Sequence, residues 1–485
     1  MLLESGQLKS NIFTNFLWEF FSTGFAKTIG FISFIILARY LIPDEFGLFA
    51  FVQIILSFVV LLLDLGINQT VVKSRDDDIA YSAFFINLLF AVLLFFILFF
   101  SAPFIASIFN KRELASILRI AAISFFFIPF ISIQNAILVK EMRFKEASLY
   151  NTVSVFSSSL FSVIFAIYGM GVWSFIYGQI IGQMFQTFVM AYYSRWMPKI
   201  RFNKKHAREL LMYGSLITIH DVVSWITSTF DNLVVGKFLG TSFLGIYKVG
   251  FDIGSFPAVM IAGSMNKVFY SIFGRLQNDK EELKSFYLKS LKYLSLVMFP
   301  IGASLIIFSD EIVIGLMGNK WKDAIIVVKI IAIYGILAGF GGNATLFLRA
   351  IGRANITTTI QMVRAPILIV AFLYCAPKGL FAISLSHAVM IVLVIPLYLF
   401  ITMWAVGIKP SEGLQIFIKP MIAFAVFILT ALASKHIFSE LGIFNPLISL
   451  PLSFFVYTVT ILLIDIKMKI EFKEKIARII NERMG

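Results

Sequence analysis

The sequence predicts an all-α membrane protein with about fourteen transmembrane helices, arranged as two six-helix bundles and two further C-terminal helices. Composition is the first reason, because 59% of the 485 residues are hydrophobic and 14% are charged, whereas a soluble domain has about 25% charged residues. The second is that apolar stretches of roughly 20 residues, each long enough to cross a bilayer as a helix, recur along the chain. The third is a sequence motif that occurs twice in the chain, with the two copies 198 residues apart.

The apolar stretches give the predicted helices in order. The first bundle takes the stretches at 12–41, 46–70, 80–109, 115–140, 146–168 and 172–193. The second bundle takes those at 210–239, 243–271, 284–308, 321–350, 355–377 and 379–403, and the last two helices lie at 413–437 and 444–465. The first stretch is too long for a cleavable signal peptide and another follows at once, so we expect it to remain a membrane helix. Cys375 is the only cysteine, so no intrachain disulfide is possible.

These helices divide the chain into five parts. They are an N-terminal six-helix bundle (1–194), a basic cytoplasmic linker (195–209), a C-terminal six-helix bundle (210–405), two extra transmembrane helices (406–466) and a charged cytoplasmic tail (467–485). The linker and the tail each contain six Lys or Arg residues, and the turns after the fourth and eighth helices are also basic. The alternate turns are poorer in positive charge. The positive-inside rule therefore predicts that both termini are cytoplasmic, and the net charge of +14 needs no nucleic-acid partner.

The repeated phrase predicts how the two bundles are related. Residues 38–50 read ARYLIPDEFGLFA and residues 236–248 read GKFLGTSFLGIYK, with Gly47 aligned on Gly245. Because six predicted helices separate the copies, both copies point the same way across the membrane. That arrangement predicts a pseudo-two-fold axis along the membrane normal. Further matching residues follow each copy. Asn68 matches Asn266 at the same offset, and Asn135 matches Asn343 at a slightly longer offset.

The second copy resembles a known signature. Residues 231–240 (DNLVVGKFLG) and 244–247 (LGIY) resemble the seventh-to-eighth helix region of Wzx-type polysaccharide flippases. These belong to the multidrug/oligosaccharidyl-lipid/polysaccharide exporter superfamily, and the resemblance is strongest to the colanic-acid exporter branch. Residues 37–49 (LARYLIPDEFGLF) resemble the first and second helices of that family. The resemblance covers roughly residues 12–400 and depends on the order and spacing of several motifs.

The resemblance implies a MATE-like fold and a flippase that is not an enzyme. Such proteins move an undecaprenyl-pyrophosphate-linked oligosaccharide across the bacterial inner membrane by alternating access of two bundles. The implied partners are this lipid-linked oligosaccharide and membrane lipids, with a polysaccharide polymerase and a chain-length regulator as further candidates. The sequence contains no HExxH, CxxC or Walker motif, so neither ATP use nor a cofactor is expected, and an ion or proton gradient is a candidate driving force. A multidrug antiporter of the same superfamily is the alternative, although such antiporters have twelve spans.

Charged residues within the apolar stretches are the candidate substrate-binding site. Lys27 and Arg364 lie near the middle of the first and eleventh predicted helices, where a charge costs about 2.5–3.5 kcal/mol on insertion scales and usually faces a cavity. We expect both to face a shared central cavity and to bind pyrophosphate, Arg as a fork and Lys as a point charge. The alternative is a structural ion pair, such as Lys27 with Glu19 or Asp231. Arg39 and Lys237 are weaker candidates, because snorkelling to the headgroups explains cations near helix ends.

Acidic residues are candidates for ion coupling. Asp64, Asp221 and Asp231 could each bind a coupling cation or proton, with helix capping or ion pairing as the alternative. Asp252 lies one helical turn after Lys248, so an intrahelical pair is the simpler interpretation.

Two remaining features are interpreted as packing. His220 and His387 are lone histidines, which are more often helix-contact residues than proton relays. The glycines of Gly339–Gly342 lie in an apolar stretch that follows no strand, so they favour close helix packing over phosphate binding.

Overall fold

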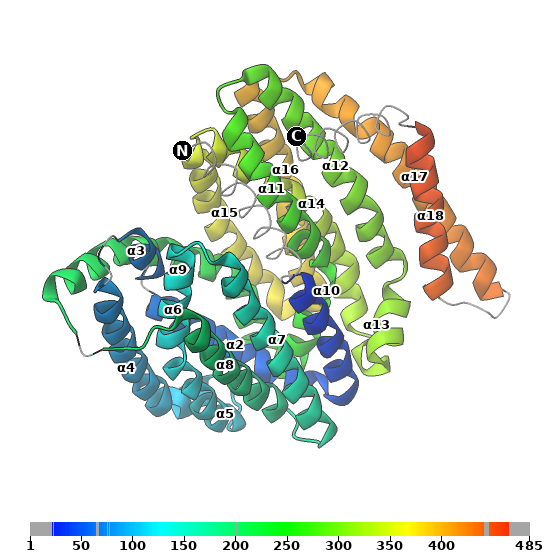
Figure 1. The fold of residues 1–485 in the computed structure, drawn as a ribbon. Coiled ribbons are helices and arrows are strands. Elements are labelled where there is room, and N and C mark those ends of the chain that lie inside the picture. The colour runs from blue at the N-terminus through cyan, green and yellow to red at the C-terminus, as the bar shows by residue number, and fades with distance from the viewer. Residues whose placement is uncertain are drawn as a thin grey trace. The chain divides into compact units, whose positions relative to one another are not determined.

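The computed structural model describes residues 22–464 except 23, 65, 66, 75, 77, 200 and 441–445. Every regular element within these residues is a helix, which agrees with the predicted all-α class (Figure 1). The chain divides into two compact units, Met1–Lys248 and Val249–Gly485. The boundary between bundles that the sequence predicts, at the basic linker 195–209, stays a prediction.

The described part of unit 1 opens with a helix that includes residues 24–40. The elements that follow are α2 (Pro43–Asp64), α3 (Ile67–Lys73), α4 (Ile79–Ile108), α5 (Glu113–Ala121), the 3-10 helix η1 (Ala122–Phe126), α6 (Ile128–Lys140), α7 (Phe144–Ile167), α8 (Trp173–Ser194), α9 (Lys204–Leu239) and α10 (Thr241–Gly254), whose last residues belong to unit 2.

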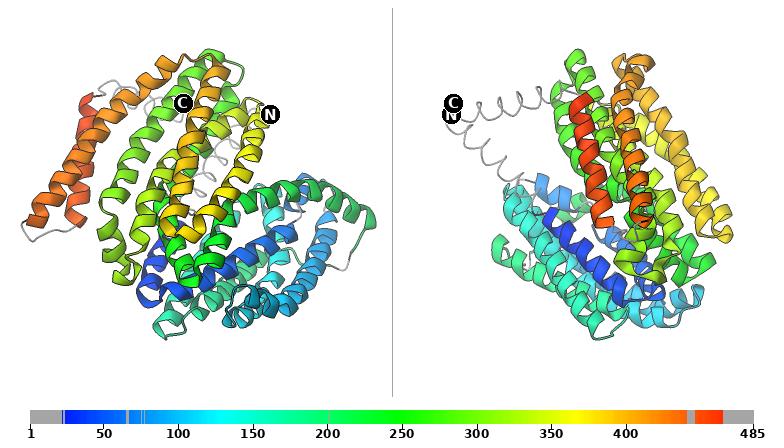
Figure 2. Two further views of the ribbon diagram at one scale, coloured as in Figure 1. Left: turned by 180° about the vertical axis from the view of Figure 1, so that it is seen from behind. Right: turned by 90° about the vertical axis from the view of Figure 1, so that its right-hand side faces the viewer.

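Within the described residues, unit 2 continues with a π-helical turn, eight α-helices and two 3-10 helices. Its elements are η2 (Pro257–Ala262), α11 (Gly263–Leu276), α12 (Lys280–Ile307), α13 (Ser309–Met317), η3 (Asn319–Trp321), α14 (Ala324–Ala350), α15 (Ala354–Cys375), η4 (Ala376–Lys378), α16 (Leu380–Val406), α17 (Pro410–Glu440) and α18 (Pro446–Ile464). The last two helices lie side by side, and α17 packs along α12 (Figures 1 and 2).

The helices confirm a multi-pass membrane protein, whereas the number of spans is not fixed by them. Each of the fourteen predicted stretches is helical over most of the length that the structure describes. Nine helices in the described part of the chain are long and apolar enough to cross a membrane, and α10 with Pro257–Leu276 would add a tenth as a span bent by 48°. The count of fourteen therefore stays a prediction.

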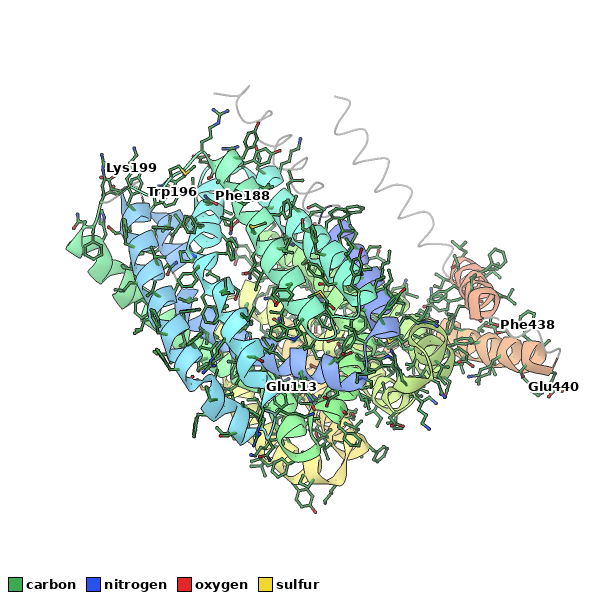
Figure 3. All side chains as sticks on the ribbon, turned by 90° about the horizontal axis from the view of Figure 1, so that it is seen from below. Glu113, Phe188, Trp196, Lys199, Phe438 and Glu440 are labelled. Carbon is green, nitrogen blue, oxygen red and sulfur yellow. The ribbon has the colours of Figure 1, made fainter. Side chains whose placement is uncertain are left out.

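The turns of unit 1 gather at two opposite ends. At one end, Lys111 before α5 forms an ion pair of 3.0 Å with Asp44 of α2. At the other end, Arg201 before α9 pairs with Asp78 before α4, also at 3.0 Å. Figure 3 shows the same separation, because Glu113 lies far from Lys199. The turns before α2 and α5 thus meet at one end and those before α4 and α9 at the other, as expected for a chain that crosses a bilayer repeatedly.

Small residues allow α7 and α8 to pack closely. A Cβ atom on Gly182 would lie 2.7 Å from the Cβ of Ser158 and 2.8 Å from the carbonyl oxygen of Ser154, and one on Gly178 would overlap the hydroxyl of Ser162. This spacing is the small-xxx-small pattern that lets membrane helices approach each other.

Glycines play the same role in unit 2. A Cβ atom on Gly335 of α14 would lie 2.5 Å from the carbonyl oxygen of Gly254, and one on Gly339 would lie 2.9 Å from the Cβ of Ala262. A Cβ on Gly342 would lie 2.9 Å from Asn266 Nδ2. The interpretation of Gly339–Gly342 as a close-packing segment is therefore confirmed.

Candidate functional site

Arg364 lies beside a cavity in unit 2. It is near the middle of α15, and the cavity, of about 410 Å³, is bounded by α11, α14, α15 and α16. The side chain is half-buried. Its Nε atom is buried, and no acceptor among the described residues lies within hydrogen-bonding distance of it. The guanidinium group is thus held in an apolar helix with part of its hydrogen-bonding capacity unused.

The cavity wall contains neutral polar groups around this single charge. Gln361 lies one turn before Arg364 on α15, Thr345 lies on α14, and Tyr334 and Tyr398 come from α14 and α16. Among the described residues that line the cavity there is no Asp or Glu. An anion entering the cavity would therefore meet a cation and several hydrogen-bonding groups, without a competing carboxylate.

A buried amide network forms the wall behind the cavity. Asn266 of α11 donates to the carbonyl oxygen of Gly339 at 3.2 Å, and Asn343 of α14 donates to Asn266 Oδ1 at 3.4 Å. Ser290 of α12 donates to Asn343 Oδ1 at 3.3 Å. In the sequence, both asparagines stood out only because each matches an asparagine of the first repeat copy. Their position in apolar helices was the available signal, because a buried amide requires a hydrogen-bonding partner.

The other predicted cation of the membrane interior, Lys27, lies in unit 1. Lys27 is half-buried in the first helix and already interacts with another group. A cavity of about 700 Å³ adjoins the same helix, and its described lining includes Phe25, Leu149 and Tyr193 but not Lys27. The expectation that Lys27 and Arg364 share one cavity stays a prediction.

The two weaker cation candidates are exposed. Lys237 donates from Nζ to the carbonyl oxygen of Ile108 at 2.6 Å, and Ile108 is the last residue of α4. A cation at this position satisfies a carbonyl at a helix C-terminus, where the helix dipole also favours positive charge. Arg39 is exposed near the end of the first helix. The snorkelling interpretation of both residues stays a prediction.

Of the acidic candidates, Asp231 is the one that the structure places in the protein interior. It is 2% exposed, and its two oxygens accept hydrogen bonds from the hydroxyl of Tyr247 at 2.8 Å and from Asn232 Nδ2 at 3.0 Å. Asp252 is exposed. The side chains of Asp64 and Asp221 lie outside the part of the chain that the structure describes.

The described residues also bear on the histidines and on metal binding. His387 packs against the rings of Phe251, Tyr334 and Phe372, the last at 4.6 Å between centroids, which agrees with its interpretation as a helix-contact residue. The side chain of His220 lies outside the described residues. Within the described part of the chain, no three His, Cys, Asp or Glu side chains gather as a metal site would require.

Comparison with known proteins gives the family. A family model described as polysaccharide biosynthesis protein matches residues 36–326. The teichuronic acid biosynthesis protein TuaB of Bacillus subtilis (strain 168) is 25% identical over 347 residues, which cover 70% of this chain and 71% of TuaB. The succinoglycan biosynthesis transport protein ExoT of Rhizobium meliloti (strain 1021) is 24% identical over 357 residues, with 70% and 72% covered.

A solved structure shows the fold. The lipid II flippase MurJ, in an inward closed conformation, matches with a TM-score of 0.76 at 16% identity, covering 93% of this chain and 99% of that chain. This likeness shows a common fold. Since the family model spans more than half of the sequence, this chain belongs to the polysaccharide biosynthesis protein family.

Proposed function

We propose that this protein flips an undecaprenyl-pyrophosphate-linked oligosaccharide across the bacterial inner membrane by alternating access, for the synthesis of a surface polysaccharide. Three findings support the proposal. The chain belongs to a polysaccharide biosynthesis family, its relative ExoT is named as a transport protein, and its fold is shared with the lipid II flippase MurJ.

The observation that carries the proposal is the incompletely bonded Arg364 beside its cavity. A pyrophosphate is a dense negative charge, and leaving it unpaired in a low-dielectric interior costs far more than leaving a neutral polar group unpaired. A transporter of such a lipid must therefore supply a cation along the path. Arg364 supplies one in the middle of α15, with a buried Nε that lacks an acceptor among the described residues. A guanidinium can bind two phosphate oxygens as a fork.

The proposed architecture has fourteen transmembrane helices with both termini in the cytoplasm. Two six-helix bundles related by a pseudo-two-fold axis along the membrane normal would precede α17 and α18. The alternation of turns in unit 1 supports this topology. The orientation rests on charge, because the turns that carry Arg143 and Arg201 are basic and belong on the cytoplasmic side.

The test compares two substitutions of Arg364. We expect Arg364→Ala to abolish flipping and Arg364→Lys to retain part of it, because Lys keeps the charge and loses only the fork. Surface polysaccharide per unit of membrane-inserted protein measures the effect. Met362→Ala is the matched control, since Met362 lies on the same helix and is 64% exposed.

Two outcomes would contradict the proposal. Full export by the Arg364→Ala variant would show that transport does not require the cation at this position. A fall in membrane abundance, with export per molecule unchanged, would assign Arg364 a structural role. The alternative function, a multidrug antiporter, predicts that the substitution changes drug resistance and leaves the polysaccharide intact.

A further inference from the structure

Two long helices carry a proline at corresponding places in the sequence repeat. Pro103 lies inside α4 and Pro300 lies inside α12, and their separation of 197 residues is one less than the offset of the repeated motif. Proline has no backbone N–H, so the carbonyl four residues earlier loses its donor within the helix. The two carbonyls affected in this way are those of Phe99 and Leu296. A carbonyl without a donor is costly in an apolar environment.

In unit 1, the side chain of Arg119 bonds to the carbonyl that Pro103 leaves without a donor. Arg119 lies on α5, and its Nε atom donates to the carbonyl oxygen of Phe99 at 3.1 Å. The guanidinium carbon also lies 4.8 Å from the centroid of the Phe99 ring, which is a cation–π distance. A neighbouring helix thus supplies the hydrogen bond that the proline removes from α4.

In unit 2, a tyrosine of the last helix does the same for Pro300. The hydroxyl of Tyr457, on α18, donates to the carbonyl oxygen of Leu296 at 2.7 Å. Tyr457 is 4% exposed, so water has little access to this bond. Removing the donor of a buried hydrogen bond leaves the acceptor with its full desolvation cost.

The two units take the donor from different helices. The offset of 208 residues that matches Asn135 with Asn343 matches Arg119 with Val327, and a valine side chain has no donor. The second copy therefore lacks the arginine that serves the first copy. Tyr457 lies outside both copies of the repeat, in the C-terminal helix pair, and supplies the missing hydrogen bond.

The helix pair α17–α18 also contacts α12 and α13 away from Pro300. Lys435 of α17 donates to the carbonyl oxygen of Ile307 at the end of α12 and forms an ion pair with Glu311 of α13, each at 2.8 Å. Near the start of α12, Lys284 pairs with Glu412 of α17 at 2.8 Å. The apolar residues buried between these polar contacts are Ala303, Phe308, Ala423, Phe427, Ala431 and Tyr457.

We propose that Arg119 and Tyr457 are carbonyl caps that fix the proline breaks of α4 and α12, and that the helix pair α17–α18 braces α12 through Tyr457. Without its cap, each carbonyl would lie in an apolar region without a donor. The two halves of the helix, which are not joined by a backbone hydrogen bond at the proline, could then change their angle. Each cap acts within its own unit and does not depend on the proposed function.

Double-mutant cycles test the proposal by thermal unfolding of the full chain in detergent. Tyr457→Phe should lower the unfolding midpoint of the parent. It should have a smaller effect when Pro300→Ala is also present, because the alanine N–H can then donate to the carbonyl of Leu296. Arg119→Met and Pro103→Ala should be coupled in the same way. An effect of either cap variant that is equal with and without its matched proline would overturn that cap.

Two controls show whether the coupling is specific. Tyr457→Phe and Pro103→Ala should be additive, because Tyr457 donates to the carbonyl of Leu296. Thr458→Val removes a hydroxyl that donates to Phe454 within α18 at 2.8 Å, and its effect should be the same with and without Pro300→Ala. Coupling in these control pairs as strong as in the matched pairs would overturn the proposal.

Membrane abundance replaces the unfolding midpoint for any cap variant that does not accumulate. The matched proline substitution should then restore accumulation, because it returns a donor to the carbonyl. Accumulation that is not restored by Pro300→Ala for Tyr457→Phe, or by Pro103→Ala for Arg119→Met, would overturn the cap concerned.

A second measurement follows the angle of α12 at Pro300. Spin labels at Ser285→Cys and Ile314→Cys, exposed positions on either side of the proline, report this angle in a Cys375→Ser background. The parent should give one narrow distribution of distances. Tyr457→Phe should broaden the distribution, and adding Pro300→Ala should narrow it again. A distribution that Tyr457→Phe leaves unchanged would show that α18 does not brace α12 and would overturn the proposal.

Discussion

At the scale of single residues, the sequence located the charge on the cavity but not its neighbours. Arg364 was found because a cation in an apolar stretch is conspicuous and costly. Asn266 and Asp44 were not assigned roles, because their importance depends on which helices lie beside them. Asn266 contacts α14, 73 residues later, and Asp44 contacts Ser242, 198 residues later. A local sequence pattern covers neighbouring residues, so it cannot reveal contacts between residues that are 73 or 198 positions apart.

Asp310 offers a test of charge at the residue scale. Burial alone would raise the pKa of this carboxyl group, but the hydrogen bond from Lys329 and the charges of Lys329 and Lys435 lower it below 3.8. A lowered pKa stabilises the fold above the unfolded value, and that stabilisation is lost as the pH falls through the folded value.

We therefore expect Asp310→Asn to reduce stability at pH 7 and to have no effect at a pH below the folded pKa. The loss should be about 0.2–1 kcal/mol, because the pair is partly exposed and screened by solvent. Thermal unfolding in detergent at neutral and strongly acidic pH measures it. An equal loss at both pH values would show that the charge is not responsible.

At the scale of elements, the sequence predicted which segments are helical but not where they break. The stretch predicted as one helix at 115–140 is α5, η1 and α6, with Pro129 near the start of α6. The stretch at 243–271 is interrupted by the π-helical turn that begins at Pro257. Hydropathy is continuous across both breaks, and proline is the local residue that disfavours a continuous helix.

The α7–α8 pair provides the prediction at this scale. Gly182→Ala should destabilise the protein by about 1–3 kcal/mol, the usual cost of overpacking, because its Cβ would approach Ser158 to within 2.7 Å. Gly274→Ala is the matched control, since a Cβ there would meet nothing within 4 Å. Thermal unfolding of the two variants in detergent measures the difference. Equal stabilities would contradict the close packing of α7 and α8.

At the scale of the whole molecule, the open question is which helices cross the membrane. Helix α8 is one test of it, because this helix is not among the nine helices of the described residues that pass on length and hydropathy. Its 22 residues span about 33 Å at 1.5 Å per residue, which matches a hydrocarbon thickness of about 30 Å. Its polar side chains lower the hydropathy, but Gln179 accepts a hydrogen bond from Gln53 and Gly178 and Gly182 pack on α7. Bonding of the Gln179 amide within the protein lowers the cost of placing this helix in a membrane, although its average hydropathy is low.

We therefore predict that the two ends of α8 lie on opposite sides of the membrane. Tyr168, in the turn before α8, is 80% exposed, and Lys199, after α8, is also exposed. In a Cys375→Ser background, an impermeant thiol reagent added outside whole cells should label Tyr168→Cys at once. Lys199→Cys should be labelled only after the membrane is permeabilised, because its turn carries the basic residues that the positive-inside rule keeps in the cytoplasm. Labelling of both positions from outside would mean that α8 does not cross, and the chain would then have an odd number of spans with its termini on opposite sides.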